Sequence, residues 1–192
     1  MNPRAIKRLR RHEELDEGFT LIELLVVLLI IGILLAIAIP TFLSVTKGAN
    51  NTAAQSNLQT ALTGAKTYFE SANQTYTNLE VTGGAYSTIN QVDTGLVFLS
   101  GNNSVSSTTS NNISASIKNS GATLVLTAYS AGTRDCWGIE DVTATQAVNW
   151  TGTADTAVGT YYAVWKGVAN TACAANMTTA PTTFSSTGFP HA

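Results

Sequence analysis

Residues 18–45 read GFTLIELLVVLLIIGILLAIAIPTFLSV, and this stretch decides how the rest of the chain is organised. No residue from Leu24 to Val45 carries a charge. About 20 apolar residues are enough for a helix to cross a bilayer. The stretch therefore predicts a membrane-spanning helix, with the carboxylate of Glu23 at the edge of the hydrocarbon.

Glu23 needs an explanation because ionisable groups are costly in a membrane. The cost is roughly 2.5 to 3.5 kcal/mol at a helix centre on insertion scales, so such groups normally have partners. If the chain is cut between Gly18 and Phe19, a new α-amino group arises one helical turn from Glu23, or within reach of the Glu23 of a neighbouring copy. One interpretation is thus a charge pair that cleavage creates. The other is an interfacial carboxylate at a helix end.

The first residues of this stretch resemble the signal of type IV prepilins. In that family a Gly precedes the cleavage site, an apolar residue follows it, and a Glu stands four positions further on. The resemblance is specific to about residue 40 and loose beyond it. The matching positions are Gly18, Phe19, Thr20, Leu21, Ile22 and Glu23, with Gly32 and Pro40 where many family members carry Gly and Pro.

The resemblance implies a function and a set of partners. A membrane prepilin peptidase would cut between Gly18 and Phe19 and methylate the new amine of Phe19, which keeps its positive charge. The chain would be a structural subunit, a pilin, of a type IV pilus. It would form a helical homo-oligomer with the help of an assembly platform and motor ATPases. Alternatives are a pseudopilin of a type II secretion or DNA-uptake system, and a minor pilin with an adhesin role.

The leader, residues 1–18, sets the topology. Its basic block, from Arg4 to Arg11, precedes an acidic block, from Glu13 to Glu17. Basic residues stay on the cytoplasmic side of a membrane, so we expect an inner-membrane precursor with the rest of the chain outside. A rival site follows the small-x-small tripeptide that ends at Ala38, where an ordinary signal-type cut would release a secreted domain beginning at Ile39.

The helix is expected to continue beyond the membrane segment, from Phe19 to about Ala72, or about 80 Å at 1.5 Å per residue. Residues 19–45 would form the half that lies in the membrane or filament core, and residues 46–72 an amphipathic half with apolar side chains at helical spacing. The alternative is two helices broken at Pro40 or Gly48. The resemblance implies that Glu23, Gly32 and Pro40 serve assembly, and that residues 32–40 lose helicity in a filament.

Residues 73–192 predict a small antiparallel β-sheet head, which makes the fold α+β and type IV pilin-like. Residues 119–121 offer a hairpin turn. Residues 101–112 are expected to be a polar loop and residues 178–192 an irregular tail. The expected strands cover residues 96–99, 113–117, 122–129, 136–142 and 160–166.

The chain has two cysteines, Cys136 and Cys173, and both follow the predicted membrane segment. An oxidising compartment favours a disulfide between them. It would resemble the C-terminal disulfide loop of many pilins. Two buried free thiols are the alternative. The aromatic residues of the same region could bind sugars, but we expect them in the core between sheet and helix. They are Trp137, Trp150, Tyr161, Tyr162 and Trp165.

The residue inventory argues against an enzyme. Of the two histidines, His12 lies in the leader and His191 next to the C-terminus, so no Cys/His metal cluster and no Ser-His-Asp set is expected. We therefore expect no catalytic residue, metal or cofactor, and no basic stripe for nucleic acid. Asp135, Glu140 and Asp141 are interpreted as a solvated loop rather than as a calcium site or an acid pair.

Overall fold

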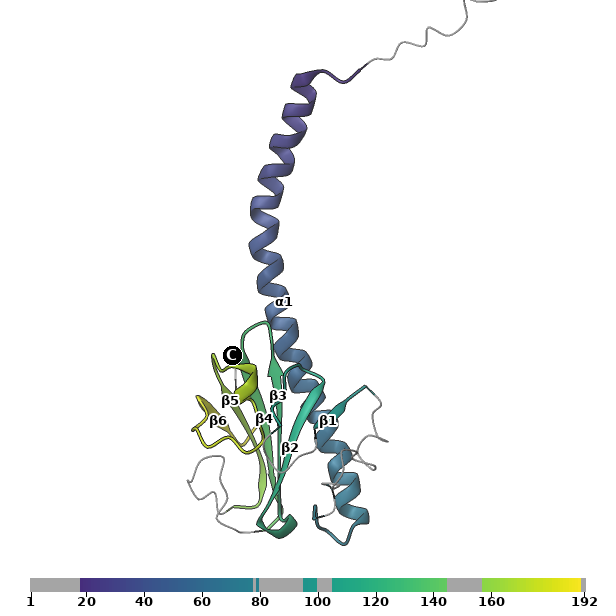
Figure 1. The fold of residues 1–192 in the computed structure, drawn as a ribbon, viewed down its shortest axis with the longest axis vertical. Coiled ribbons are helices and arrows are strands. Elements are labelled where there is room, and N and C mark those ends of the chain that lie inside the picture. Colours follow the sequence, from purple (N-terminus) through teal and green to yellow (C-terminus); the bar gives the residue numbers. More distant parts are fainter. Residues whose placement is uncertain (1–17, 78, 80–94, 100–104, 145–156, 191–192) are drawn as a thin grey trace, which may run out of the picture. The chain divides into compact units, whose positions relative to one another are not determined.

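The structure is a computed structural model that describes residues 18–77, 79, 95–99, 105–144 and 157–190. It divides into two compact units, one that ends at Leu43 and one from Ser44 to Ala192. Helix α1 (Leu21–Ser71) contributes residues to both, and the described strands all belong to the second unit (Figure 1).

In the first unit, α1 is apolar on every side and its side chains are exposed. The large apolar residues from Leu21 to Leu43 are all at least 45% exposed. The helix runs without a break through Pro40, where the hydroxyl of Thr41 donates to the carbonyls of Ile37 and Ala38 at 3.1 and 2.9 Å. A Thr hydroxyl next to Pro can satisfy carbonyls there. The structure therefore has one continuous helix here, and the alternative of two helices broken at Pro40 or Gly48 is wrong.

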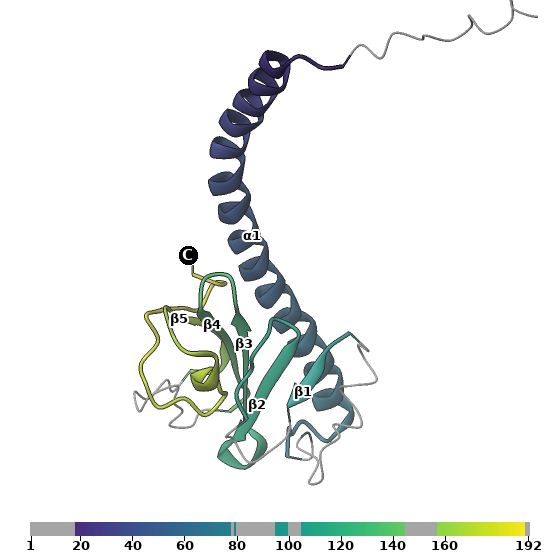
Figure 2. The same ribbon diagram turned by 45° about the horizontal axis from the view of Figure 1, so that its top comes forward.

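In the second unit, the C-terminal half of α1 covers one face of a sheet (Figures 1 and 2). Alanine and leucine residues recur every three or four positions and are almost completely buried. This is the spacing of one helical face. They are Ala54, Leu58, Ala61, Leu62 and Ala65.

The described strands form one sheet in which neighbours along the chain are neighbours in space, in the order β1-β2-β3-β4-β5-β6. All pairs are antiparallel except β1 with β2, which is parallel. The sheet is thus mostly antiparallel, as expected. A parallel pair needs a long connection, and the stretch between Leu99 and Asn112 is long enough for one. The strands are β1 (Val97–Leu99), β2 (Asn112–Lys118), β3 (Thr123–Ser130), β4 (Asp135–Val142), β5 (Gly159–Trp165) and β6 (Thr183–Ser185).

The predicted hairpin turn at residues 119–121 joins β2 to β3. Asn119, Ser120 and Gly121 all have positive φ, at 53°, 55° and 91°. A Cβ atom on Gly121 would collide with the hydroxyls of Thr75 and Thr77. Glycine is therefore needed here for close approach as well as for its φ.

The two faces of the sheet have different covers, which corrects the expectation for the aromatic residues. Trp137 is completely buried in the cluster between sheet and α1, as predicted. Trp165 is also buried, but on the opposite face, beside Cys173 and Ala175 of the C-terminal segment. Side chains alternate between faces along a strand, so β4 and β5 supply both clusters. Trp150 lies outside the described residues.

The tail expected to be irregular contains a strand. β6 pairs with β5 through Tyr162–Ser185, Ala163–Phe184 and Val164–Thr183. Further along, Phe189 makes an edge contact with Trp137 at a centroid distance of 5.7 Å. Three residues give too short a pattern to be recognised in the sequence, and this strand is placed by its pairing with β5.

Candidate assembly site

The start of α1 is built by Thr20 and Glu23. Gly18, Phe19 and Thr20 are exposed and lie outside the helix, which begins at Leu21. The amide N–H and the hydroxyl of Thr20 both donate to Oε2 of Glu23 at 2.8 Å. In return, the amide N–H of Glu23 donates to Oγ1 of Thr20 at 3.3 Å. This reciprocal arrangement is a capping box, which satisfies N–H groups that a helix leaves unpaired at its N-terminus.

The capping box gives Glu23 a partner that sequence reasoning missed. From the sequence, Glu23 is interpreted either as the partner of an amine that cleavage would create or as an interfacial carboxylate at a helix end, whereas in the structure its own Thr20 already binds it. The signal was present, since Thr20-Leu21-Ile22-Glu23 fits the T-x-x-E pattern before an apolar run. The scissile bond expected between Gly18 and Phe19 lies just before this cap.

The other expected assembly residues, Gly32 and Pro40, do not join Glu23 in one cluster. Successive members of this set are separated by roughly 12 to 14 Å along α1, at 1.5 Å rise per residue. Apart from the adjacent residues and the local helix backbone, no atom of the described chain lies within 4 Å of a Cβ placed on Gly32. In the described part of the first unit, residues 18–43, the charged side chain of Glu23 lies at the N-terminal end. It is followed by an exposed apolar helix that is long enough to cross a membrane by length and composition.

The acidic residues of β4 are buried, so the prediction of a solvated loop was wrong. Asp135, Glu140 and Asp141 are 6%, 0% and 5% exposed. Each has a nearby polar or basic group. Oδ1 of Asp135 accepts from the amide N–H of Gly167 at 3.3 Å, and the charge of Glu140 acts on Lys118, which lies on the neighbouring hairpin.

Lys118 shows how β4 tolerates a buried carboxylate. Burial lowers the pKa of the Lys118 ammonium, and the negative charge of Glu140 acts in the opposite direction. An ion of each sign in the same buried region reduces the cost that either would have alone. Within the described residues, no group of three or more His, Cys, Asp or Glu side chains is arranged to hold a metal ion.

Asp141 fastens α1 to the sheet, and we call its contacts the Asp141 cluster. Its Oδ2 accepts from the Tyr76 hydroxyl at 2.8 Å. Its Oδ1 accepts from the Thr160 hydroxyl at 2.7 Å and lies 3.0 Å from Nζ of Lys66. Lys66 also donates to Thr160 at 3.1 Å. One carboxylate thus joins α1, the segment after α1, β4 and β5.

Tyr76→Phe tests this cluster and should lower the free energy of unfolding by about 1 to 3 kcal/mol, since a buried carboxylate oxygen loses its donor. The stabilisation should also depend on pH. Burial, the larger cause, and the charge of Asp141, the smaller one, raise the pKa of the Tyr76 phenol far above its usual value. The stabilisation is therefore complete below about pH 10, the usual pKa, and declines as the pH rises above it. Denaturant unfolding at several pH values should show the difference between wild type and variant shrinking in alkali. A difference that stays constant to pH 11 would contradict this account.

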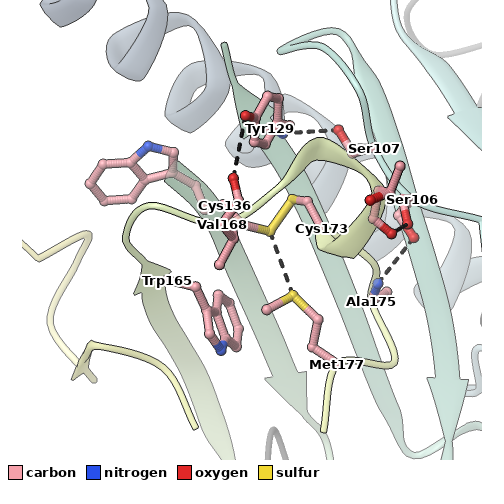
Figure 3. The surroundings of a disulfide bond; sticks show 12 residues. Ser106, Ser107, Tyr129, Cys136, Trp165, Val168, Cys173, Ala175 and Met177 are labelled. Carbon is pink, nitrogen blue, oxygen red and sulfur yellow. Dashed lines mark hydrogen bonds between the residues drawn. A yellow bond between two sulfur atoms is a disulfide. The ribbon is translucent and has the colours of Figure 1, made fainter. Parts of the chain in front are cut away.

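The C-terminal segment is tied to the face of the sheet opposite α1 (Figure 3). A disulfide joins Cys136 of β4 to Cys173, with the Cα atoms 5.4 Å apart. Sδ of Met177 lies 3.8 Å from Sγ of Cys136. Backbone contacts extend the attachment, because the amide of Ser107 donates to the carbonyl of Cys173 at 2.7 Å and the hydroxyl of Ser107 accepts from the amide of Tyr129 at 2.9 Å.

Two comparisons with known proteins show what the chain is similar to. Residues 16–39 match the family described as "Prokaryotic N-terminal methylation motif". The chain is also 44% identical over 62 residues to a protein described as "Type IV major pilin protein PilA" from Myxococcus xanthus (strain DK1622). That match covers 32% of this chain and 28% of the relative. No solved structure matches. The chain is thus similar to type IV pilins, and its α+β fold is type IV pilin-like.

Proposed function

We propose that this chain is the structural subunit of a type IV pilus. The observation that carries the proposal is the first unit, an apolar helix that is exposed on every side and lies largely within the matched methylation motif. Such a surface is stable in lipid or against other helices, but not in water. This surface supports a role as a packed structural subunit more directly than it supports a catalytic role. The relative's description as a major pilin also supports the structural role.

Processing would prepare the subunit. In the proposal, a prepilin peptidase removes residues 1–18 and methylates the amine of Phe19. The bond lies outside the helix, because α1 begins only at Leu21, and a non-helical backbone is accessible to a peptidase. The basic part of the leader remains in the cytoplasm, so the second unit is outside the inner membrane.

Assembly would then transfer α1 from the bilayer to the filament core. Lipid is as apolar as the side chains of this helix, so burial itself contributes little net drive. Packing and the pairing of Glu23 with the amine of Phe19 must supply the specificity. An assembly platform and motor ATPases would provide the energy for extraction. In the filament, residues 32–40 are the part of α1 proposed to lose helicity, since Pro40 has no amide N–H to donate.

The proposal is tested on filaments sheared from cells that express the chain. Electron microscopy should show long filaments, and mass spectrometry of their subunit should find a mature N-terminus at Phe19 carrying one methyl group. A mature N-terminus at Ile39 would instead indicate a secreted domain. Correct processing without long filaments would favour a pseudopilin of a secretion or DNA-uptake machine, and a subunit present only at filament tips would favour a minor pilin.

A further inference from the structure

In the uncut chain, the carboxylate of Glu23 is bound by Thr20 at the start of α1. Before cleavage there is no amine at Phe19, although Glu23 already stands at the edge of the apolar segment. In the structure, both donors of Thr20 bind the same carboxylate oxygen, Oε2. Oε1 accepts no hydrogen bond from the described part of the chain. The carboxylate is therefore held in one place with one oxygen available.

We propose that Thr20 is a positioning residue for Glu23. It holds the carboxylate on its own chain in the precursor and presents Oε1 to the amine that appears at Phe19 after cleavage. The inference rests on the proposed pilus function, since the amine arises only if the leader is removed. It adds a second partner to a site that would otherwise consist of one carboxylate and one amine.

The capping box is compatible with cleavage. Hydrolysis of the Gly18–Phe19 bond puts the new amine on Phe19, while the amide N–H of Thr20 stays in the Phe19–Thr20 peptide bond. Both Thr20 donors and the Thr20 acceptor therefore survive. Fixing the Glu23 side chain beforehand removes rotamer freedom that pairing would otherwise have to restrict. The same carboxylate can thus serve the helix start and the charge pair at once.

Thr20→Val is the decisive variant, because valine keeps the shape and the backbone N–H but has no hydroxyl. It removes one donor to Glu23 and the acceptor for the Glu23 amide. We expect normal leader removal and a fall in filament yield of roughly tenfold, the upper part of the range for a lost N-cap. Thr20→Ser restores the hydroxyl and should return the yield to within about twofold of wild type.

Thr63→Val is the matched control. Thr63 is an exposed residue of α1 whose hydroxyl donates to the carbonyl of Gln59 at 2.9 Å. This hydroxyl makes its hydrogen bond within α1, far along the chain from Glu23. We expect Thr63→Val to process and assemble like wild type. The comparison separates loss of the Thr20 hydroxyl from loss of any helix hydroxyl.

Hydrogen exchange of the full-length chain in detergent micelles gives a reading that does not depend on filaments. The Glu23 amide should exchange roughly tenfold faster in Thr20→Val than in wild type, and at the wild-type rate in Thr20→Ser. The inference is overturned if Thr20→Val exposes this amide yet assembles at the wild-type yield, or if serine fails to rescue. If wild type itself forms no filaments, the exchange result still describes the cap, but the proposed function and the positioning role both fail.

Discussion

Cells whose only copy of the chain carries Glu23→Gln should cleave the leader and retain the protein in the membrane, yet yield roughly a hundredfold fewer filaments. Glutamine can still accept the hydrogen bond from the Thr20 amide, since a capping box takes Glu or Gln. The variant thus keeps the helix start and loses only the charge. Removing one partner of a buried pair costs about 3 to 5 kcal/mol, and about 1.4 kcal/mol is a factor of ten.

The measurement needs three readings on the same cells. Mass spectrometry of the membrane fraction reports leader removal, immunoblotting reports the amount of membrane-bound subunit, and electron microscopy with quantified sheared protein reports filaments. Glu23→Val should lose at least as many filaments as Glu23→Gln, because it lacks the charge and also the acceptor of the capping box. Wild-type filament yield from Glu23→Gln would show that the carboxylate acts only as a cap.

Together, substitutions at Thr20 and Glu23 separate the two uses of the carboxylate. Thr20→Val keeps the negative charge and weakens the cap, whereas Glu23→Gln keeps a capping acceptor and removes the charge. We expect the second change to have the larger effect on filament yield. Charge pairing is specific to assembly, while the cap contributes about 1 kcal/mol wherever a helix begins.

Local patterns explain why much of the fold was predictable from the sequence. The apolar face that includes Ala54, Leu58 and Ala65 has helical spacing, and these residues are buried against the sheet. Turn residues at 119–121 separate two alternating segments, and the structure places β2 and β3 on either side of them. In each case the residues that carry the signal are close together in the chain.

The features that were not predicted depend on distant residues. Asp141 looked like part of a solvated acidic loop, but its partners Tyr76 and Lys66 belong to the segment after α1 and to α1 itself. Trp165 was expected beneath α1, yet its indole N–H donates to the carbonyl of Thr179 at 2.8 Å on the opposite face. Sequence periodicity predicts that a strand residue is buried, but it does not predict which segment of the chain packs against that residue.

Thr20 is a different kind of omission, because its signal is local and was present in the sequence. The T-x-x-E pattern at Thr20 and Glu23 coincides with the family's signal motif, so the whole motif was attributed to processing and pairing. The structure shows that the same residues also determine where the helix begins. A motif with one accepted role can have a second physical role.

Replacing both Cys136 and Cys173 by serine should lower the free energy of unfolding by about 3 to 4 kcal/mol. The two residues are 37 positions apart, and on the chain-entropy model a cross-link that closes a loop of this size contributes roughly that much. The loss should fall on the second unit, where the C-terminal segment covers Val125, Tyr129 and Trp165. Denaturant unfolding of the full chain in detergent, followed by tryptophan fluorescence, measures it.

The controls decide whether the covalent link itself is responsible. Wild type unfolded under a strong thiol reductant should coincide with the double serine variant, while the variant should not respond to the reductant at all. The Ser107 contacts with Cys173 and Tyr129 involve backbone groups of the latter residues, so they are available to both forms and do not enter the difference. A loss below about 1 kcal/mol would mean that packing of Trp165 and Ala175 holds the segment in place without the link, since burial of large side chains contributes energies of this order.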